Sequence, residues 1–254
     1  MMSDRPTLTI AYSTLPDRIK NIAFPEKSDD REILVLVQNV NESSYIFSEP
    51  NAKLVELRNK GVAKSRNAAL ERASGEFLLF GDDDIKFIET GVVQALKYFT
   101  EHPECAIILS QAIDESGEFR KNYFGEATPL KLTNSARAAT YEMLVRVDVI
   151  REKKIRFDEA FGAGANNYLG DEYIFIADAL KAGLKGVHLP VKIAVHPRES
   201  SGSRWGSDAD LSARAMVFRR VFGWRAPFYR AAFLIKTSNP WPGLGKALRF
   251  ILAK

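Results

Sequence analysis

The sequence predicts an α/β fold in which a mainly parallel sheet is flanked by helices and followed by a helical C-terminal tail. Three observations support this prediction. The 254 residues are 46% hydrophobic, enough apolar material for one large core. Short apolar runs rich in Ile, Leu and Val alternate with helical patterns over the first half of the chain. Beyond residue 207 the chain shows only helical patterns.

The expected strands are short buried runs, and the expected helices often end near Gly or Pro. Strands are predicted at residues 7–12, 33–38, 53–57, 77–80, 106–110 and 139–145, with an extended segment at 186–195. Helices are predicted at residues 62–73, 89–101, 172–182, 208–222, 226–236 and 244–253. Because strands and helices alternate, we expect ligands to bind beyond the carboxyl ends of the parallel strands.

Charge is distributed unevenly along the chain. Nine of the 36 Lys and Arg lie in residues 211–254, whereas all 32 Asp and Glu precede them, so the first 210 residues carry a net charge of −5. We therefore divide the chain into a domain at 1–207 and a basic, aromatic tail at 208–254. This composition favours binding to an anionic membrane surface. Packing of the tail on the domain is the second interpretation, and nucleic-acid binding is the weakest.

Several function classes lack sequence support. There is no Gly-x-x-x-x-Gly-Lys loop and no Gly-x-Ser-x-Gly motif, and the glycine-containing stretch 162–167 lacks the third glycine of a dinucleotide site. Cys105 is the single cysteine, which suits a reducing compartment. No secretory signal is recognisable, and no apolar run approaches the roughly 20 residues that cross a bilayer. We expect a cytoplasmic protein that is either soluble or peripheral on the inner face of the cell membrane.

The most specific chemical feature is Asp82-Asp83-Asp84, which directly follows a hydrophobic strand. Three adjacent carboxylates repel one another, so a fold keeps them at a strand end when a cation lies among them. In an extended segment the first and third side chains point to the same side, and their hard oxygens suit Mg²⁺ or Mn²⁺. A solvated acidic turn is the alternative, but the position at the carboxyl edge of the sheet favours a metal site.

The predicted helix that leads into the acidic strand carries Arg66 and Asn67 near its start. An arginine there is suited to contact phosphate or an acidic cluster, although an ordinary surface arginine is the alternative. Residues 61–84, from Gly-Val-Ala-Lys-Ser-Arg-Asn to Phe-Gly-Asp-Asp-Asp, resemble the core motif of the family 2 glycosyltransferases with the GT-A fold. With later segments, the resemblance covers roughly residues 7–206.

The resemblance implies transfer of a sugar from a nucleotide-diphosphate donor to an acceptor hydroxyl, generally with inversion at the anomeric carbon. It places Asp82 and Asp84 in the Asp-x-Asp metal site, and Asp82, Asp83 and Arg66 beside the nucleotide. A bound dication stabilises the charge that develops on the leaving diphosphate.

Residues 161–183 resemble the later motif of that family, in which a glycine-bearing loop precedes an acidic pair that opens a helix. An inverting displacement needs a base within reach of the acceptor hydroxyl. Here the pair is Asp171-Glu172, the reverse of the commonest order in the family. We favour Glu172 over Asp171 as the base, because an Asp at the start of a helix is expected to act as its N-cap.

The remaining site predictions concern the third metal ligand and the nucleotide base. His196 ends the extended segment; a lone histidine there is more often structural, but the resemblance favours a metal ligand or diphosphate contact. The family often has an aspartate after the second strand, whereas this chain has Gln38-Asn39. We expect Tyr12, Ser13 and Gln38 to line the base site, with UDP favoured by family frequency alone.

The sequence therefore predicts an inverting glycosyltransferase that uses Mn²⁺ or Mg²⁺ and a nucleotide-diphosphate sugar. The expected acceptor is a saccharide or a polyprenyl-linked molecule in surface polysaccharide synthesis. A sugar-1-phosphate nucleotidyltransferase is the neighbouring alternative, but residues 13–21 contain no glycine-rich loop. A noncatalytic adaptor that binds membrane or nucleic acid is the other alternative, and the intact candidate site argues against it.

Overall fold

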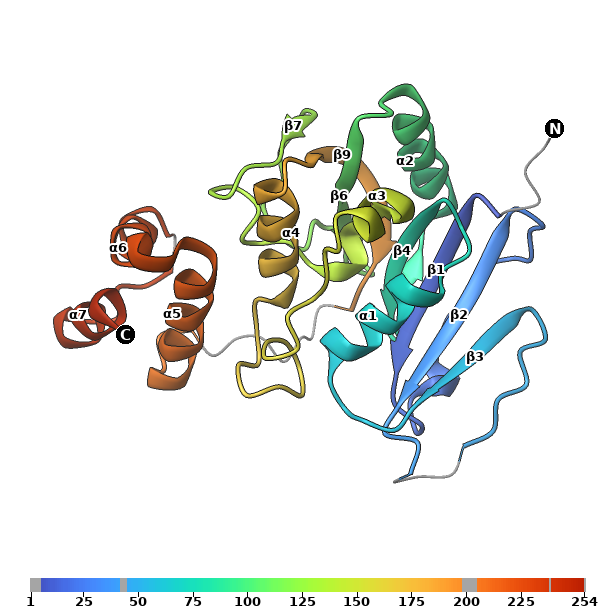
Figure 1. Cartoon of the computed structure of the whole chain (residues 1–254), viewed down its shortest axis with the longest axis horizontal. Helices are drawn as coiled ribbons and strands as arrows, with labels where there is room; N and C mark the ends of the chain where they lie inside the picture. The colour runs from blue at the N-terminus through green and yellow to red at the C-terminus, as the bar shows by residue number, and fades with distance from the viewer. Residues whose placement is uncertain (1–5, 42–44, 198–204, 238, 254) are drawn as a thin grey trace.

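The computed structural model describes residues 6–41, 45–197, 205–237 and 239–253. A central sheet runs through it, with helices on both faces and a helical C-terminal group at one end (Figure 1). The strands are β1 (Leu8–Thr14), β2 (Arg31–Gln38), β3 (Ala52–Leu57), β4 (Phe77–Asp82), β5 (Lys86–Phe87), β6 (Cys105–Ile113), β7 (Thr128–Pro129), β8 (Met143–Arg146) and β9 (Lys185–Val195). Their order is β3-β2-β1-β4-β8-β6-β9-β5, and β7 also pairs with β9.

The sheet contains both parallel and antiparallel strands, and their directions determine which loops lie at each edge of the sheet. Strands β3, β2, β1 and β4 are parallel, as are β6 and β9, whereas β8 lies antiparallel between β4 and β6. The amino end of β8 therefore lies at the same edge as the carboxyl ends of β4 and β6. A 3₁₀ turn, η2 (Thr140–Glu142), precedes β8, so the strand predicted at 139–145 is a turn followed by a shorter strand.

The helices cover the two faces of the sheet unequally. Helices α1 (Val62–Arg72), α3 (Val147–Glu152) and α4 (Asp171–Lys181) pack on one face, and α2 (Glu89–Glu101) and the short turn η1 (Ile19–Asn21) pack on the other. Small residues such as Ala63 and Ala69 let α1 approach the sheet closely. On the opposite face, Phe99 of α2 stacks on Phe77 of β4 with ring centroids 4.6 Å apart. Both faces are therefore dry cores that hold the edge of the sheet in place.

The C-terminal helices are α5 (Asp208–Phe222), the turn η3 (Gly223–Arg225), α6 (Ala226–Lys236) and α7 (Leu244–Leu252). Helix α5 packs on α4 through Val217 and Val221. Gly170, which precedes α4, has φ +91°, and a Cβ built there would lie 2.4 Å from a methyl group of Val217. A glycine is required for both reasons, and α5 is a close neighbour of the start of α4.

Helices α6 and α7 pack on α5 rather than on the sheet domain (Figure 1). The buried Arg230 ties the three helices together by donating hydrogen bonds to the carbonyl oxygens of Ala215, Ile251 and Ala253. The sequence-based interpretation that the tail packs on the domain therefore applies to α5. No described helix is long and apolar enough to cross a membrane.

Candidate active site

A cavity of about 690 Å³ lies at the edge of the sheet where β1 and β4 end, and it collects residues from most of the chain. All but one of the site residues predicted from the sequence line it: Ser13, Gln38, Arg66, Asp82, Asp83, Asp84, Asp171, Glu172 and His196. Lys60, Val62 and the loop residues Ala163, Gly164, Tyr168, Leu169 and Gly170 complete much of its wall. Segments far apart in sequence thus meet at one place, as expected for strand ends of an α/β sheet.

Arg66 is the buried cation of this cavity. It lies in the second turn of α1, is 5% exposed, and contacts the carboxylates of Asp171 and Glu172, the latter at 3.3 Å. Its other terminal nitrogen is 3.8 Å from Asp82. A buried guanidinium needs such partners because desolvation of an unpaired charge is costly. Arg66 therefore connects the acidic end of β4 with the acidic start of α4.

Asp171 and Glu172 have opposite electrostatic environments although they are adjacent. Burial raises the pKa of Asp171 to about 7, and the charge of Glu172 adds to the rise. Burial acts in the same direction on Glu172, but Arg66 and a 2.9 Å hydrogen bond donated by Thr140 outweigh it, so the pKa of Glu172 is lowered. Of the two carboxyl groups, Asp171 is therefore the one that binds a proton more readily, and Glu172 is the one that stays charged more readily.

The expectation that Asp171 acts as an N-cap is wrong. The N-cap residue is Gly170, in the left-handed conformation, and Asp171 is the first residue of α4. Its carboxylate faces Arg66 and lies so close to Gly162, where φ is +94°, that a Cβ on that glycine would be 2.7 Å from Oδ1. Glu172 is also held in place, by Arg66 and Thr140, with 21% of its side chain exposed to the cavity side against 3% for Asp171.

Asp84 and His196 form the second polar pair. His196 Nε2 lies 3.9 Å from Asp84 Oδ1, and the imidazole stacks on Tyr141 with ring centroids 4.8 Å apart. Its Nδ1 is 2.7 Å from the carbonyl oxygen of Pro197. Since a carbonyl only accepts hydrogen bonds, Nδ1 carries the proton in the neutral ring and Nε2 presents a lone pair toward Asp84.

Asp82 does not join this pair in a closed metal site. Its contact is with Arg66, and its pKa is raised, chiefly by desolvation; Arg66 opposes the rise, and Asp84 and Glu172 add to it. In the part of the chain that the structure describes, no three His, Cys, Asp or Glu side chains are arranged as a metal site. The predicted ligands Asp82, Asp84 and His196 thus share one cavity, with Asp84 and His196 facing each other.

Asp83 and Arg18 link the acidic end of β4 to the loop after β1. Asp83 is 5% exposed, accepts a 2.8 Å hydrogen bond from Thr14 and lies 2.5 Å from Arg18, which is also 3.3 Å from Asp84. Burial raises the pKa of Asp83, while Thr14 and Arg18 oppose the rise. Asp83 therefore serves mainly to hold the two strand ends together.

Of the predicted base-site residues, Ser13 and Gln38 line the cavity and Tyr12 does not. Ser13 Oγ hydrogen-bonds Ser65 Oγ at 2.7 Å, and Gln38 Oε1 accepts from the backbone N–H of Gly61 at 2.9 Å. Tyr12 lies on the opposite face of β1, fully buried between Phe24 and Phe87. Neighbouring residues of a strand point to opposite faces, and the side chain of Tyr12 belongs to the core on the α2 side of the sheet instead of to the cavity.

Sequence reasoning missed Arg18, Thr140 and Tyr141. Arg18 comes from a loop without a motif. A basic residue in the loop after β1 would have indicated a partner for the acidic triplet only if β1 and β4 were known to be neighbours. Thr140 and Tyr141 contact Glu172 and His196 from η2, which no motif marks. The polar loop that follows His196, residues 198–204, lies outside the described residues.

Comparisons with known proteins bear on the fold and the family of the chain. TarS of S. aureus, residues 1–349, is similar with 15% sequence identity and a TM-score of 0.59, covering 90% of this chain and 69% of that one. A longer TarS chain is matched over 43% of its length. The mannosyltransferase PcManGT from Pyrobaculum calidifontis, in complex with GDP-Man and Mn²⁺, has 16% identity and a TM-score of 0.55, covering 98% of this chain and 71% of that one. No curated protein sequence matches the chain.

At these identities the structural likeness establishes a shared GT-A fold. A family model described as glycosyl transferase family 2 matches residues 28–155, which is half of the chain. The match includes β2, α1, β4 and the acidic triplet. The sequence match and the fold lead to one conclusion: the chain belongs to glycosyl transferase family 2 and is a glycosyltransferase.

Proposed function

We propose that the protein is an inverting, divalent-metal-dependent enzyme that transfers a sugar from a nucleotide-diphosphate sugar to the hydroxyl of a saccharide or lipid-linked acceptor. The observation that carries this proposal is one cavity that holds both a lone-pair site, Asp84 and His196, and an ionised, oriented carboxylate, Glu172. The first suits a metal diphosphate and the second suits an acceptor hydroxyl. Residues 1–207 form the catalytic part in this proposal, and we place the reaction in surface polysaccharide synthesis.

The donor set of Asp84 and His196 fits Mg²⁺ or Mn²⁺. A carboxylate oxygen and an imidazole nitrogen that both accept, 3.9 Å apart, are stabilised when a cation lies between them. Mg²⁺ is usually bound through one or two carboxylates together with phosphate oxygens and water, so a closed three-residue site is not needed. The presence of Mn²⁺ with GDP-Man in the PcManGT structure supports this assignment. When bound, the metal stabilises the charge on the leaving diphosphate.

Glu172 is the proposed general base. As the acceptor oxygen attacks the anomeric carbon, Glu172 accepts the hydroxyl proton, the bond from that carbon to the diphosphate oxygen breaks, and the nucleotide leaves with the electron pair. A single displacement of this kind inverts the anomeric configuration. Thr140 and Arg66 hold the carboxylate in one orientation, and the raised pKa of Asp171 reduces the negative charge beside it.

The nucleotide is proposed to lie along Ser13, Gln38 and the end of β4, with Arg66, Asp82 and Asp83 beside it. UDP is favoured, and TarS structures that contain UDP and UDP-GlcNAc support it. Because the PcManGT structure contains GDP-Man, GDP sugars should be tested beside UDP sugars as donors.

We also propose that α6, α7 and the turns beside them bind an anionic membrane surface. Phe228 and Ile235, seven residues apart on α6, are 71% and 82% exposed and share a face that points away from the buried stripe of that helix. On α7, Leu244 and Leu248 are one turn apart and exposed, while Ala247 and Phe250 fill the contact with neighbouring helices. The apolar stripe of each helix is thus wider than its intramolecular packing needs.

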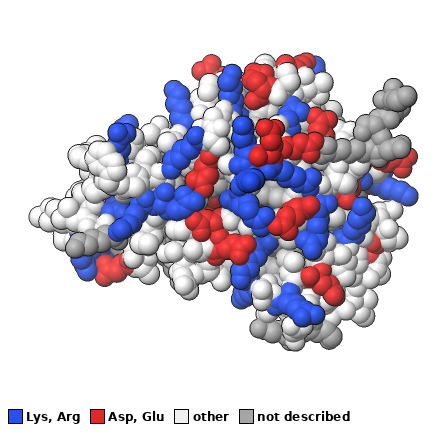
Figure 2. Space-filling model, viewed as in Figure 1, with Lys and Arg blue, Asp and Glu red and all other residues white. Residues whose placement is uncertain are grey.

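Tryptophans and bases accompany these exposed stripes. Trp224 and Trp241 are 78% and 58% exposed, and Arg225 lies over the Trp224 ring at 5.0 Å. In Figure 2 the end of the molecule occupied by these helices is mostly uncharged on the face shown, with Lys and Arg bordering it. Exposed Trp, Phe and Leu bordered by bases match the headgroup region of an anionic leaflet. A polyprenyl-linked acceptor would lie in the same plane.

A screen of nucleotide sugars tests the catalytic proposal. Protection against thermal unfolding by UDP and GDP sugars is measured with Mn²⁺ and with EDTA, and the protecting donor is then used in a transfer assay with lipid-linked and free saccharides. We expect protection that requires the metal, and release of the nucleoside diphosphate with an inverted glycosidic product. Release of pyrophosphate from a sugar 1-phosphate and a nucleoside triphosphate would instead identify a nucleotidyltransferase.

A further inference from the structure

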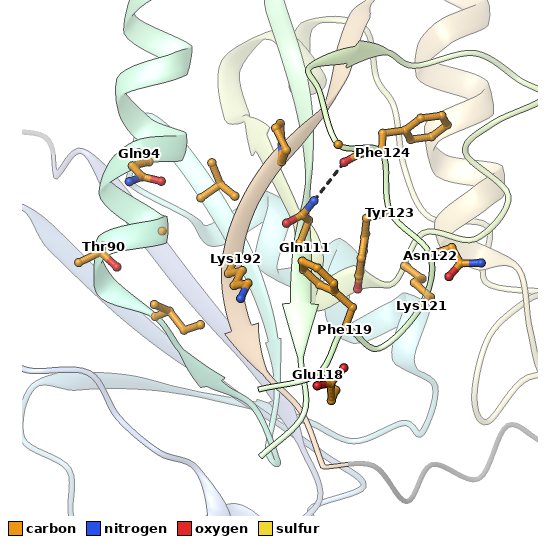
Figure 3. Close-up of a pocket in the computed structure, with 15 residues that line it drawn as sticks. Thr90, Gln94, Gln111, Glu118, Phe119, Lys121, Asn122, Tyr123, Phe124 and Lys192 are labelled. Carbon is orange, nitrogen blue, oxygen red and sulfur yellow. Dashed lines mark hydrogen bonds between the residues drawn. The ribbon is translucent and has the colours of Figure 1, made fainter. Parts of the chain in front are cut away.

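A second cavity of about 1060 Å³ lies away from the donor site and shares no lining residue with it. Figure 3 shows its two walls. Thr90 and Gln94 of α2 form one side, and residues 118–125, between β6 and β7, form the other. Lys192 of β9 and Gln111 of β6 lie between them. We name this cavity the β9 groove.

The lining of the β9 groove combines aromatic rings and amides with three charged side chains, those of Glu118, Lys121 and Lys192. Phe119 and Phe124 are 51% and 43% exposed, and the amides of Gln94, Gln111 and Asn122 lie along the same walls. Exposed aromatic rings beside neutral hydrogen-bonding groups suit a ligand that has both apolar C–H faces and many hydroxyls, which is the surface of a sugar.

Three contacts hold the aromatic wall in place before any ligand binds. Lys192 Nζ lies 5.1 Å from the centroid of Phe119, and Phe119 packs edge-on against Tyr123 at 5.6 Å. Gln111 donates a 3.1 Å hydrogen bond to the carbonyl oxygen of Phe124 (Figure 3). A wall ordered in this way loses less conformational entropy on binding than a free loop does.

The same wall is attached to the catalytic residues through η2. Tyr123 and Lys121 donate hydrogen bonds to the buried Glu142, at 2.6 and 2.5 Å. The two residues before Glu142 are Tyr141, which stacks on His196, and Thr140, which bonds Glu172. One short turn therefore positions both the groove wall and the proposed base.

Strand β9 runs from the groove toward the donor cavity. Lys192 lines the groove and His196 lines the donor cavity, four residues further along the strand. At roughly 3.3 Å per residue the two positions are about 13 Å apart. A single sugar cannot contact both, whereas a chain of sugars can.

We infer that the β9 groove binds the non-reacting sugar units of an oligosaccharide acceptor, whose terminal hydroxyl is presented to Glu172. This inference rests on the proposed function and narrows it: the acceptor is an oligosaccharide, recognised at a distance from the bond that forms. Phe119 is its main contact, and Asn122 and Gln94 bind hydroxyls on either wall.

Direct binding tests the inference without requiring catalysis. Labelled Glu172→Gln protein is applied to an array of mono-, di- and oligosaccharides of hexoses, N-acetylhexosamines and hexuronic acids, and the strongest binder is titrated by calorimetry. We expect oligosaccharides to bind and the matching monosaccharides to show no detectable binding. Phe119→Ala should weaken the titrated affinity about tenfold, since a large aromatic contact is lost. Val93→Ala, 55% exposed on α2 but outside the groove, should bind like the parent.

The outcomes separate this inference from the proposed function. An array on which no oligosaccharide binds, or a Phe119→Ala variant that binds as tightly as its parent, overturns the β9 groove as an acceptor site. Binding of UDP or GDP to the same proteins reports on the donor site alone and should be equal in all of them. Loss of donor binding or of transfer would therefore count against the donor and base assignments, while array binding that depends on Phe119 would still support the groove.

Discussion

His196 Nε2 and Asp84 Oδ1 face each other at 3.9 Å, and the hydrogen bond of Nδ1 to Pro197 leaves both of these atoms as acceptors in the neutral ring. Two acceptors so close repel each other weakly until a proton or a metal ion lies between them. The two residues follow different strands, Asp84 after β4 and His196 after β9. Each can therefore be replaced separately to test the metal proposal.

Removal of either group should weaken metal-dependent donor binding. We expect His196→Ala and Asp84→Asn to lower the affinity for UDP or GDP in Mn²⁺ on the order of 10- to 100-fold, and to leave the weak affinity in EDTA unchanged. Calorimetry in the two buffers measures this. His102→Ala, a histidine at the end of α2 far from the cavity, is the matched control. Equal affinity of the unmodified protein in Mn²⁺ and EDTA would show that the metal assignment is wrong.

Glu172→Gln should abolish transfer while keeping donor binding. The amide preserves the shape and still accepts from Thr140, but it cannot take a proton, so kcat should fall roughly 10²- to 10⁴-fold. Asp171→Asn should retain most activity, because that side chain is sequestered against Arg66 and favours its protonated form. Single-turnover assays on both variants decide between the carboxylates. The reverse pattern, an inactive asparagine variant and an active glutamine variant, would assign the base to Asp171.

The raised pKa of Asp171 should appear in the pH dependence of stability. Its pKa rises from 3.8 to about 7 on folding, so the folded state binds this proton more tightly than the unfolded state. The contribution to stability is therefore full below about pH 4 and is lost as the pH rises to about 7. Asp171→Asn removes this titration, and its free energy of unfolding should fall less over that window. Urea unfolding at about pH 4.5 and about pH 7.5 measures the free energy of unfolding at each pH. An equal change in this free energy between the two pH values for the parent and the variant would contradict the prediction.

The exposed face of α6 should be needed for membrane binding. In flotation with phosphatidylglycerol-containing vesicles we expect the protein to float, to float less in high salt, and to ignore neutral vesicles, since each basic residue contributes up to about 1 kcal/mol near an anionic surface. The double variant Phe228→Ser, Ile235→Ser should stay unbound. Ile46→Ser, which removes an 89% exposed side chain elsewhere, should float normally. A protein that ignores anionic vesicles at low salt would refute this role of the C-terminal helices.

The contact between Gly170 and Val217 should couple α5 to the start of α4. Gly170→Ala meets both an unfavourable φ and a steric clash, because the added Cβ would lie 2.4 Å from a methyl carbon of Val217; the change should cost about 1–3 kcal/mol. Gly183→Ala, at the other end of α4 with φ +84° and no atom within 4 Å of the added Cβ, carries the backbone cost alone. Thermal unfolding of both variants isolates the overlap. Val217→Ala should partly rescue Gly170→Ala, and strict additivity of the two changes would deny the coupling.

Periodicity and strand-end chemistry predicted much of the fold and of the donor site. The runs ending at Gln38 and Asp82 are buried on both faces, so they are near-continuous apolar sequences that are easily identified. The acidic triplet was identifiable because carboxylates rarely follow such a strand without a partner. Tyr12 was expected to line the base site together with Ser13, but strand alternation places their side chains on opposite faces.

What could not be predicted depends on tertiary partners. Nothing local marks Thr140, since a single hydroxyl residue has meaning only once α4 brings Glu172 to it. Arg18 resembles any surface base until β1 and β4 are known to be neighbours. The role of Asp171 was misjudged because helix propensity favours Asp at an N-cap, whereas here the charge of Arg66 and the space beside Gly162 determine its place.

Because β8 runs antiparallel to its neighbours, the residues at the site come before this strand, in η2, whereas for β1 and β4 they come at the end of the strand or after it. Pairing with β4 and β6 fixes the register of β8, and therefore fixes Thr140 and Tyr141 relative to the carboxylates. The long excursion from β6 to η2 ends in the Glu142 anchor and carries the aromatic wall of the groove. In the proposed function, acceptor recognition and the orientation of the base therefore depend on consecutive stretches of one segment: the excursion after β6 and the turn whose position is fixed by the four-residue strand β8.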